Sequence, residues 1–106
     1  MSEKVYISGP VSGLPLEEAQ ATFAARERAL KRAGYKVVNP LAESLKRLGY
    51  DRVWEEYMAV DVLLLLKCDM INFLEGWADS RGSRLEAAIA KEKGIAILFY
   101  KGMIYE

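Results

Sequence analysis

The chain has 106 residues, of which 52% are hydrophobic, 15 are basic and 15 are acidic. At this length folding buries roughly two thirds of the surface of the unfolded chain, which is enough for one domain with a real core. The composition is not that of a disordered chain, and the balanced charge offers no basic excess to grip a phosphate backbone. We therefore expect a single domain over residues 1–106 that has no nucleic acid polymer as its partner.

The chain has one cysteine, Cys68, and no histidine. This excludes a disulfide framework and makes the usual zinc ligand sets unavailable. The N-terminus lacks the basic and apolar regions of a signal peptide, and the apolar run over residues 62–66 is far too short to span a bilayer. We expect a cytoplasmic protein that uses no metal and no other cofactor and does not contact a membrane.

The first half of the chain predicts two strands and two helical segments. Residues 4–9 form a short β-rich run that stops at a Gly-Pro pair. Residues 16–33 have apolar side chains at helical spacing, among them Phe23 and Leu30, and Gly34 stands where a helix C-terminus favours glycine. Residues 35–40 read as a second strand halted by Pro40, and residues 41–49 as a short helix or turn.

The second half continues the alternation. Asp51 is predicted to cap a helix over residues 52–68, and a strand over 69–74, a helix over 76–94 and a strand over 95–100 follow. Each strand is too apolar to face water, which predicts a parallel sheet covered on both sides by its crossover helices. The expected fold is a three-layer Rossmann-like (flavodoxin-like) α/β domain with a mainly parallel sheet of four or five strands. The apolar tail, residues 101–106, favours burial against a second copy and thus a homo-oligomer.

Ligands of open α/β sheets bind beyond the carboxyl ends of the strands. Four segments are predicted to meet there: the three that follow the first three strands, the third of which opens the last helix, and the end of the fourth strand. Their candidate ligand-binding residues are Ser8, Gly9, Pro10, Asn39, Trp77, Ser80, Gly82 and Ser83. Asn39 and Tyr6 have an alternative role in packing at strand ends, and Trp77 is either a wall that stacks on a base or a surface lid.

The start of the last helix combines two serines with a glycine. Backbone N–H groups at a helix N-terminus carry partial positive charge, and small residues let a phosphate approach them closely. Ser80, Gly82 and Ser83 therefore suit one phosphate group. The alternative is that Ser80 is an ordinary N-cap and Gly82 a tolerated residue of the first turn. The glycines after the first strand fit neither a dinucleotide-binding motif nor a P-loop.

Two carboxylates stand out among apolar neighbours. Glu86 follows Gly82 by four residues and Ser83 by three, so the three share one helix face. Asp61 interrupts an apolar stretch, where an ionised side chain is costly unless it is paired or functional. The alternatives are that Glu86 faces solvent near a favourable helix dipole and that Asp61 faces water from an amphipathic turn.

The ordered set of motifs YISGPVSG, GYKVVNP, D-x7-D and GW-x2-S-x-G-x3-E-x3-A, from Val5 to about Phe99, resembles the nucleoside 2-deoxyribosyltransferase-like superfamily, especially its small DUF4406-type members. The resemblance implies that Glu86 is the nucleophile that attacks the anomeric carbon of a sugar. It also implies that Asp61, eight residues before Asp69, assists the reaction and that Tyr6 positions Glu86. It further implies a homodimer or higher homo-oligomer whose subunits share active sites.

A finer comparison within the superfamily concerns the residue six positions before the nucleophile. Ser80 with Gly82 is similar to the Ser-x-Gly of nucleoside 5′-monophosphate N-glycosidases, where transferases acting on free nucleosides carry an aspartate. Those hydrolases also have a serine and an arginine in the first loop, where this chain has Pro10 and Ser12. Arg81 and Arg84 are the candidates to replace that charge.

The resemblance implies cleavage or transfer of the N-glycosidic bond of a nucleoside 5′-monophosphate. A carboxylate beneath the anomeric carbon stabilises the oxocarbenium-like transition state, and a second carboxyl group with a raised pKa protonates the leaving base. The alternatives are a nucleoside 2-deoxyribosyltransferase acting on free nucleosides and a non-catalytic module that binds or senses a nucleotide. The expected ligand in each case is a small nucleotide or nucleoside.

Overall fold

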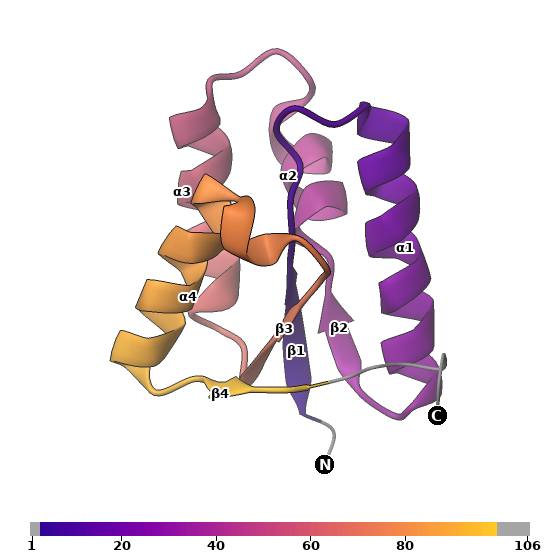
Figure 1. Cartoon of the computed structure of the whole chain (residues 1–106), viewed down its shortest axis with the longest axis vertical. Helices are drawn as coiled ribbons and strands as arrows, with labels where there is room; N and C mark the ends of the chain where they lie inside the picture. Colours follow the sequence, from indigo (N-terminus) through magenta and orange to yellow (C-terminus); the bar gives the residue numbers. More distant parts are fainter. Residues whose placement is uncertain (1–2, 100–106) are drawn as a thin grey trace.

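The structure, a computed structural model, describes residues 3–99 as alternating strands and helices (Figure 1). In chain order the elements are β1 (Lys4–Ser8), α1 (Leu16–Arg32), β2 (Lys36–Val38), α2 (Pro40–Leu48), α3 (Trp54–Leu65), β3 (Met70–Phe73), the 3-10 turn η1 (Trp77–Asp79), α4 (Arg81–Lys93) and β4 (Ala96–Ile97).

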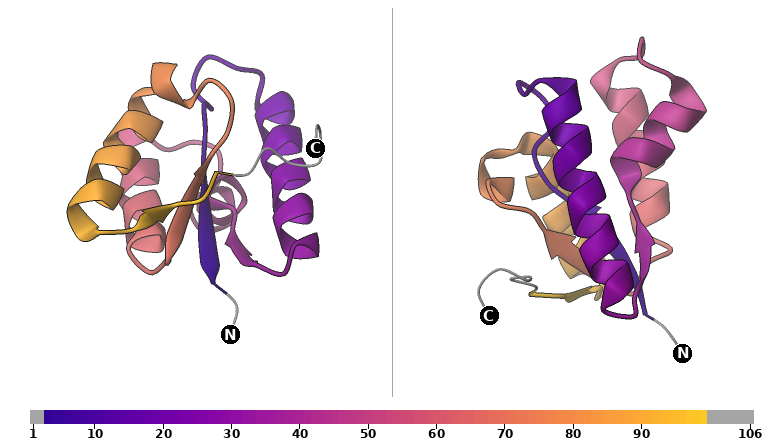
Figure 2. Two further views of the ribbon diagram at one scale, coloured as in Figure 1. Left: turned by 60° about the horizontal axis from the view of Figure 1, so that its bottom comes forward. Right: turned by 90° about the vertical axis from the view of Figure 1, so that its right-hand side faces the viewer.

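The four strands form one parallel sheet in the order β2-β1-β3-β4. Helix α1 lies on one side of this sheet, and α3 and α4 lie on the other (Figures 1 and 2). The predicted three-layer α/β class is therefore confirmed, with four strands. The chain reverses its direction of travel across the sheet between β1 and β3, which are neighbours in space. This is the topological switch point where open α/β sheets bind ligands.

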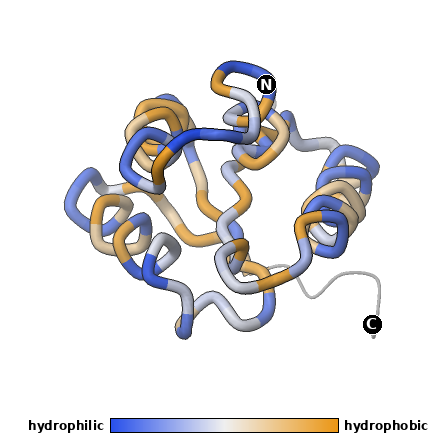
Figure 3. The backbone as a smooth tube through the Cα atoms, turned by 90° about the horizontal axis from the view of Figure 1, so that it is seen from above, coloured by the Kyte–Doolittle hydropathy of each residue, from blue (hydrophilic) through white to orange (hydrophobic). Residues whose placement is uncertain are grey.

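Alternation along β1 divides the core into two clusters. Val5 and Ile7 face α1 and pack with Phe23 and Leu30, whereas Tyr6 faces the α3 and α4 side. The cluster around Tyr6 also contains Leu65, Cys68, Ile71, Ala90 and Ile95. Viewed from above, the helices surround the strands, and both hydrophobic and hydrophilic residues occur along the helices (Figure 3). The helical spacing in the sequence has its physical origin in this two-sided burial.

Three predicted details of the elements are wrong. Helix α3 begins at Trp54, not after a cap at Asp51, because Glu56 accepts the Val53 backbone N–H and thereby closes the first turn. The last helix begins at Arg81, since Gly76 adopts φ +84 and η1 precedes the helix. The fourth strand shrinks to two exposed residues because β4 is a sheet edge, paired on one side only, with β3.

Other predicted features are confirmed. Helix α1 covers the predicted range, and Gly34 follows its C-cap with φ +100, a left-handed conformation that favours glycine. The segment predicted as a short helix or turn is the helix α2. None of the helices within residues 3–99 combines the length and apolar character needed to cross a membrane. The apolar tail on which the oligomer prediction depends lies outside the described residues.

Candidate functional site

A cleft of about 730 Å³ lies beyond the carboxyl ends of β1 and β3, in the size range of small-molecule sites. The loop after β1, helices α2 and α3, and the start of α4 supply its walls. Most of its lining is apolar or aromatic, and most of its charged and hydroxyl side chains lie on α3, on α4 or just before α4. The charged residues and serines are Ser12, Ser44, Asp61, Asp79, Ser80, Arg81, Ser83 and Glu86.

Glu86 is buried at the cleft and held by two hydroxyl groups of β1. Its side chain is 5% exposed, so the solvent-facing alternative is excluded. Tyr6 Oη donates to Glu86 Oε2 at 2.7 Å, and Ser8 Oγ donates to Oε1 at 2.6 Å. Tyr6 and Ser8 point to the same sheet face because strand side chains alternate with a period of two. These two bonds fix the carboxylate in one orientation.

The two hydroxyls also affect the protonation of Glu86. Burial raises the pKa of the Glu86 carboxyl, and the hydrogen bonds from Ser8 and Tyr6 oppose this rise. Burial, and then the nearby charge of Glu86, raises the pKa of the Tyr6 hydroxyl well above its ordinary value. Tyr6 therefore remains a neutral hydrogen-bond donor to Glu86 over the physiological range.

Asp61 lines the same cleft from helix α3 and is half-buried. Ser44 Oγ of α2 donates to its Oδ1 at 2.5 Å. Burial raises the pKa of Asp61 to about 7, the Ser44 hydrogen bond opposes this, and the charge of Glu86 adds to the rise. At neutral pH Asp61 therefore retains a proton for part of the time, beside a Glu86 carboxyl that two hydroxyls hold in place.

The start of α4 combines a satisfied cap with an unsatisfied hydroxyl. Ser80 is the N-cap and its Oγ accepts the Ser83 backbone N–H at 3.3 Å. Ser83 is 2% exposed, and its Oγ is the one buried side-chain oxygen or nitrogen within residues 3–99 that has no hydrogen-bond partner. A Cβ on Gly82 would lie 3.3 Å from Met58 Sδ, so this glycine brings the helix start close to α3. An unsatisfied buried hydroxyl is costly unless a ligand bonds to it.

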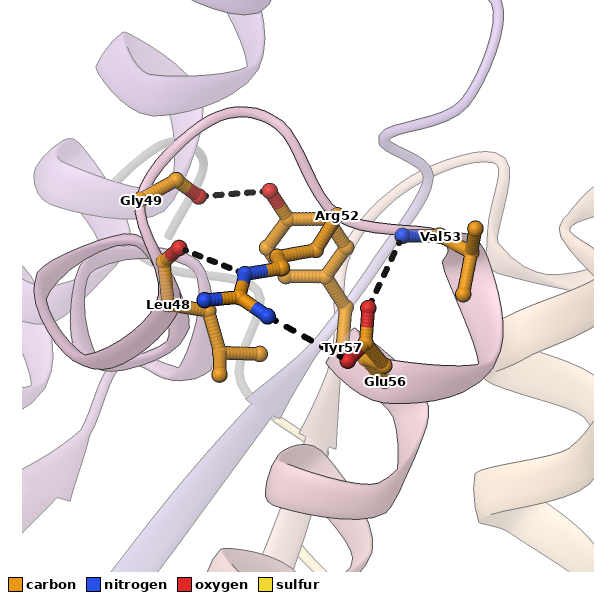
Figure 4. Close-up of polar contacts among 6 residues, drawn as sticks. All are labelled: Leu48, Gly49, Arg52, Val53, Glu56 and Tyr57. Carbon is orange, nitrogen blue, oxygen red and sulfur yellow. Dashed lines mark hydrogen bonds and ion pairs between the residues drawn. The ribbon is translucent and has the colours of Figure 1, made fainter.

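The loop between α2 and α3 is braced where it borders the cleft (Figure 4). Tyr57 Oη donates to the Gly49 carbonyl, and Arg52 bonds to the Leu48 carbonyl and pairs with Glu56. Tyr57, together with Tyr50 and Trp54, lines the cleft. The bracing gives the aromatic wall a defined position opposite α4.

The structure brings most of the predicted site residues together but not Asn39 or Trp77. Asn39 is the N-cap of α2: its Oδ1 accepts the Ala42 N–H, and its Nδ2 donates to Glu27. Trp77 stacks on Phe73 with ring centroids 4.2 Å apart and lines a different cavity beside β4. Neither residue lines the cleft, because each side chain is used in local packing or capping.

The first loop contributes backbone and small side chains. Gly9 and Pro10 line the cleft, and Ser8 acts through Glu86. A Cβ on Gly9 would lie 2.6 Å from Leu74 Cδ1, so Gly9 is required for packing against the segment after β3. Asp69 accepts the Lys4 N–H and thus belongs to the junction between α3 and β3, as its position in the sequence suggests.

Several cleft residues were missed in the sequence. Ser44 lies in a short segment with no motif, and only the fold brings its hydroxyl to Asp61. Trp54 and Met58 show helical spacing, which identifies a helix face but does not distinguish a core from a cleft wall. The aromatic content of residues 50–57 was the available signal for a ligand wall.

The fold and this cleft define an α/β domain with a two-carboxylate site at its switch point. A family profile for DUF4406, a domain of unknown function, matches residues 3–99, and the chain belongs to this family. No curated protein matches the chain significantly. Within the described range, no group of three or more His, Cys, Asp or Glu side chains is placed to hold a metal ion.

Proposed function

We propose that the protein cleaves the N-glycosidic bond of a nucleoside 5′-monophosphate, with Glu86 as the nucleophile. The observation that carries this proposal is the pair of carboxyl groups in one cleft, one fixed by two hydroxyls and the other with a pKa of about 7. A fixed carboxylate suits attack on carbon, and a group with a pKa near ambient pH suits general acid and base catalysis. The resemblance to the nucleoside 2-deoxyribosyltransferase-like superfamily supports the same roles.

The first step forms a bond between a Glu86 carboxylate oxygen and C1′ of the sugar. The C1′–N bond breaks, its electron pair leaves with the base, and Asp61 donates a proton to that base. Tyr6 and Ser8 hold the carboxylate in line and spread its charge. Ser44 holds Asp61 in the orientation required for the transfer.

The second step hydrolyses the glycosyl ester. Asp61, now ionised, accepts a proton from water as the water oxygen attacks C1′, and the Glu86 carboxylate leaves. The products are a free base and a sugar 5-phosphate, and both carboxyl groups return to their initial states. Attack by another base instead of water gives base exchange. We expect this reaction in a cytoplasmic homo-oligomer whose subunits complete one another's sites.

The test is incubation with ribo- and deoxyribonucleoside 5′-monophosphates and the matched nucleosides, followed by chromatography for released base. Release from monophosphates that disappears in Glu86→Gln supports the proposal. Preferential release from free nucleosides, with exchange when a second base is added, indicates a deoxyribosyltransferase. Tight binding without release indicates a nucleotide-binding module and contradicts the glycosidase.

Analytical ultracentrifugation of the same preparation tests the oligomer. A dimer or larger species at the concentrations used for the assay is expected. A monomer with full activity would contradict sites shared between subunits.

A further inference from the structure

The described residues that line the cleft include more acidic than basic side chains, which disfavours an anionic ligand. Asp61, Asp79 and Glu86 line it, and Arg81 is the one basic residue among the described residues that do so. A phosphate monoester carries close to two negative charges at neutral pH. Ionised acidic side chains at the cleft would repel it, so binding of such an anion here depends on how Arg81 is placed.

Arg81 is the first residue of α4 and stacks on an aromatic side chain across the cleft. Its guanidinium carbon lies 3.9 Å from the centre of the Trp54 ring. A guanidinium held over an aromatic face keeps N–H donors available for hydrogen bonds at the edge of the group. Arg84, one turn further along α4, donates to the Ala78 carbonyl at 3.1 Å and does not line the cleft.

A second observation points to a ligand at the same helix start. The Ser83 hydroxyl is buried and has no partner. Ser83 also lines the cleft, within the same first turn of α4 as Arg81. A ligand oxygen that reached this hydroxyl would supply the missing hydrogen-bond partner. An anion at this point would receive a charged donor, a neutral donor and the partial positive charge of the α4 N-terminus.

We propose that Arg81, held against Trp54, is the residue by which this cleft selects phosphorylated over unphosphorylated ligands. It replaces the charge that the loop after β1 lacks, since that loop offers Pro10 and Ser12. The proposal rests on the proposed function for the class of ligand, a nucleoside 5′-monophosphate. It concerns recognition of the phosphate and not cleavage of the glycosidic bond.

Trp54 provides a direct reporter of this recognition. In a Trp77→Phe background, Trp54 is the remaining tryptophan of the chain. Its fluorescence is titrated with inorganic phosphate, with a deoxynucleoside 5′-monophosphate and with the matched nucleoside, and calorimetry on the unmodified protein checks each dissociation constant. The variants are Arg81→Ala, Arg81→Lys and Trp54→Leu, and Arg84→Ala is the matched control.

Arg81→Ala should raise the dissociation constant of the monophosphate at least about tenfold, as loss of a charged hydrogen-bond donor predicts. The constant for the nucleoside should change less than about twofold, because no phosphate contact is lost. Arg81→Lys should recover part of the loss, since a lysine retains the charge but neither the fork nor the stacking. Arg84→Ala should match the parent protein.

Three outcomes overturn the proposal: equal losses in Arg81→Ala and Arg84→Ala, equal losses for monophosphate and nucleoside in a folded Arg81→Ala variant, or no binding of any phosphate probe to the parent protein. Failure of the proposed function is a separate result. Phosphate binding that depends on Arg81 without any base release removes the glycosidase and leaves this inference intact. Base release by Arg81→Ala with an unchanged KM removes the inference and leaves the glycosidase.

Discussion

Two helices begin at the carboxyl edge of the same sheet, and their N-termini differ in what their polar side chains bind. At α2, Asn39 caps the helix and donates to Glu27, so both ends of its amide have partners. At α4, Ser80 caps the helix but the buried Ser83 hydroxyl has no partner. Both sequences contain residues typical of helix caps. The comparison teaches that capping chemistry alone does not identify a ligand site, whereas an unsatisfied buried hydroxyl at a cleft marks a candidate for one.

The largest effect is expected for Glu86, the buried carboxylate of α4. Glu86→Gln should reduce base release at least about a thousandfold, since an amide oxygen cannot form the glycosyl ester. The fold should persist because glutamine has nearly the same shape and accepts a hydrogen bond from Tyr6 or Ser8. Initial rates of base release, with circular dichroism for the fold, provide the measurement.

Glu27→Gln is the matched control, because Glu27 contacts Asn39 at the N-terminus of α2. Glu27 lies outside the cleft, where it accepts hydrogen bonds from Asn39 and Lys31. Its rate should equal that of the parent protein. A comparable loss in both variants would mean that the reaction does not depend on the cleft carboxylate.

The second effect is on the pH dependence of stability. The pKa of Asp61 is about 7 in the folded protein, above its ordinary value of 3.8, mainly because of burial. A folded-state pKa that is raised favours folding at low pH, and this contribution is lost as the pH rises through 7. The loss amounts to at most about 4 kcal/mol for this group. Glu86, whose pKa is also raised, contributes with the same sign.

Asp61→Asn should therefore remove most of this decrease in folding stability with rising pH. Urea unfolding at pH 5 and pH 8 should show the parent protein losing stability between them relative to Asp61→Asn. Glu27 has the opposite sign, because hydrogen bonds from Lys31 and Asn39 outweigh burial and lower its pKa. Its contribution is present above its ordinary pKa of 4.5 and is lost in acid. Parallel pH profiles for the parent protein and Asp61→Asn would show that Asp61 is ionised at neutral pH without cost.

Much of the fold was readable in the sequence because it depends on patterns that span whole elements. The apolar runs of β1 and β3 and the helical spacing of α1 each reflect burial on a sheet with two covered faces. The start of α3 was not readable, since Asp51 is a good cap by type but Glu56 closes the turn instead. The extent of β4 depends on its position at the sheet edge, which no local pattern records.

Part of the candidate site was likewise readable in the sequence, and part was not. Glu86 and Asp61 stood out because carboxylates among apolar neighbours are costly, and the structure places both at one cleft. Asn39 was misplaced because a residue at a strand end is also the residue before a helix, and here capping prevails. The Ser44 contact with Asp61 joins two helices, and its geometry follows only from the tertiary fold.

The third effect concerns the N-terminus of α2, which Asn39 caps. Asn39→Ala should cost about 1 kcal/mol of unfolding free energy, the usual loss for removal of a helix cap. It should leave nucleotide affinity unchanged, because Asn39 does not line the cleft. Asn39→Ser retains a capping oxygen and should recover most of the loss. Weaker nucleotide binding in Asn39→Ala at full folding would return Asn39 to the site, as the sequence suggested.

The smallest effect on stability is expected at the N-terminus of α4, where the Ser83 hydroxyl has no partner. The sign of this effect shows whether the N-termini of α2 and α4 differ. Ser83→Ala removes a buried hydroxyl that has no partner, so it should leave the unfolding free energy unchanged or raise it by up to about 1 kcal/mol. The same variant should weaken a nucleoside 5′-monophosphate several-fold while sparing the nucleoside. Denaturant unfolding and calorimetric titration of one preparation measure both quantities. A loss of stability equal to that of Asn39→Ala would mean that the Ser83 hydroxyl already has a partner within the protein, and the two helix termini would then be equivalent.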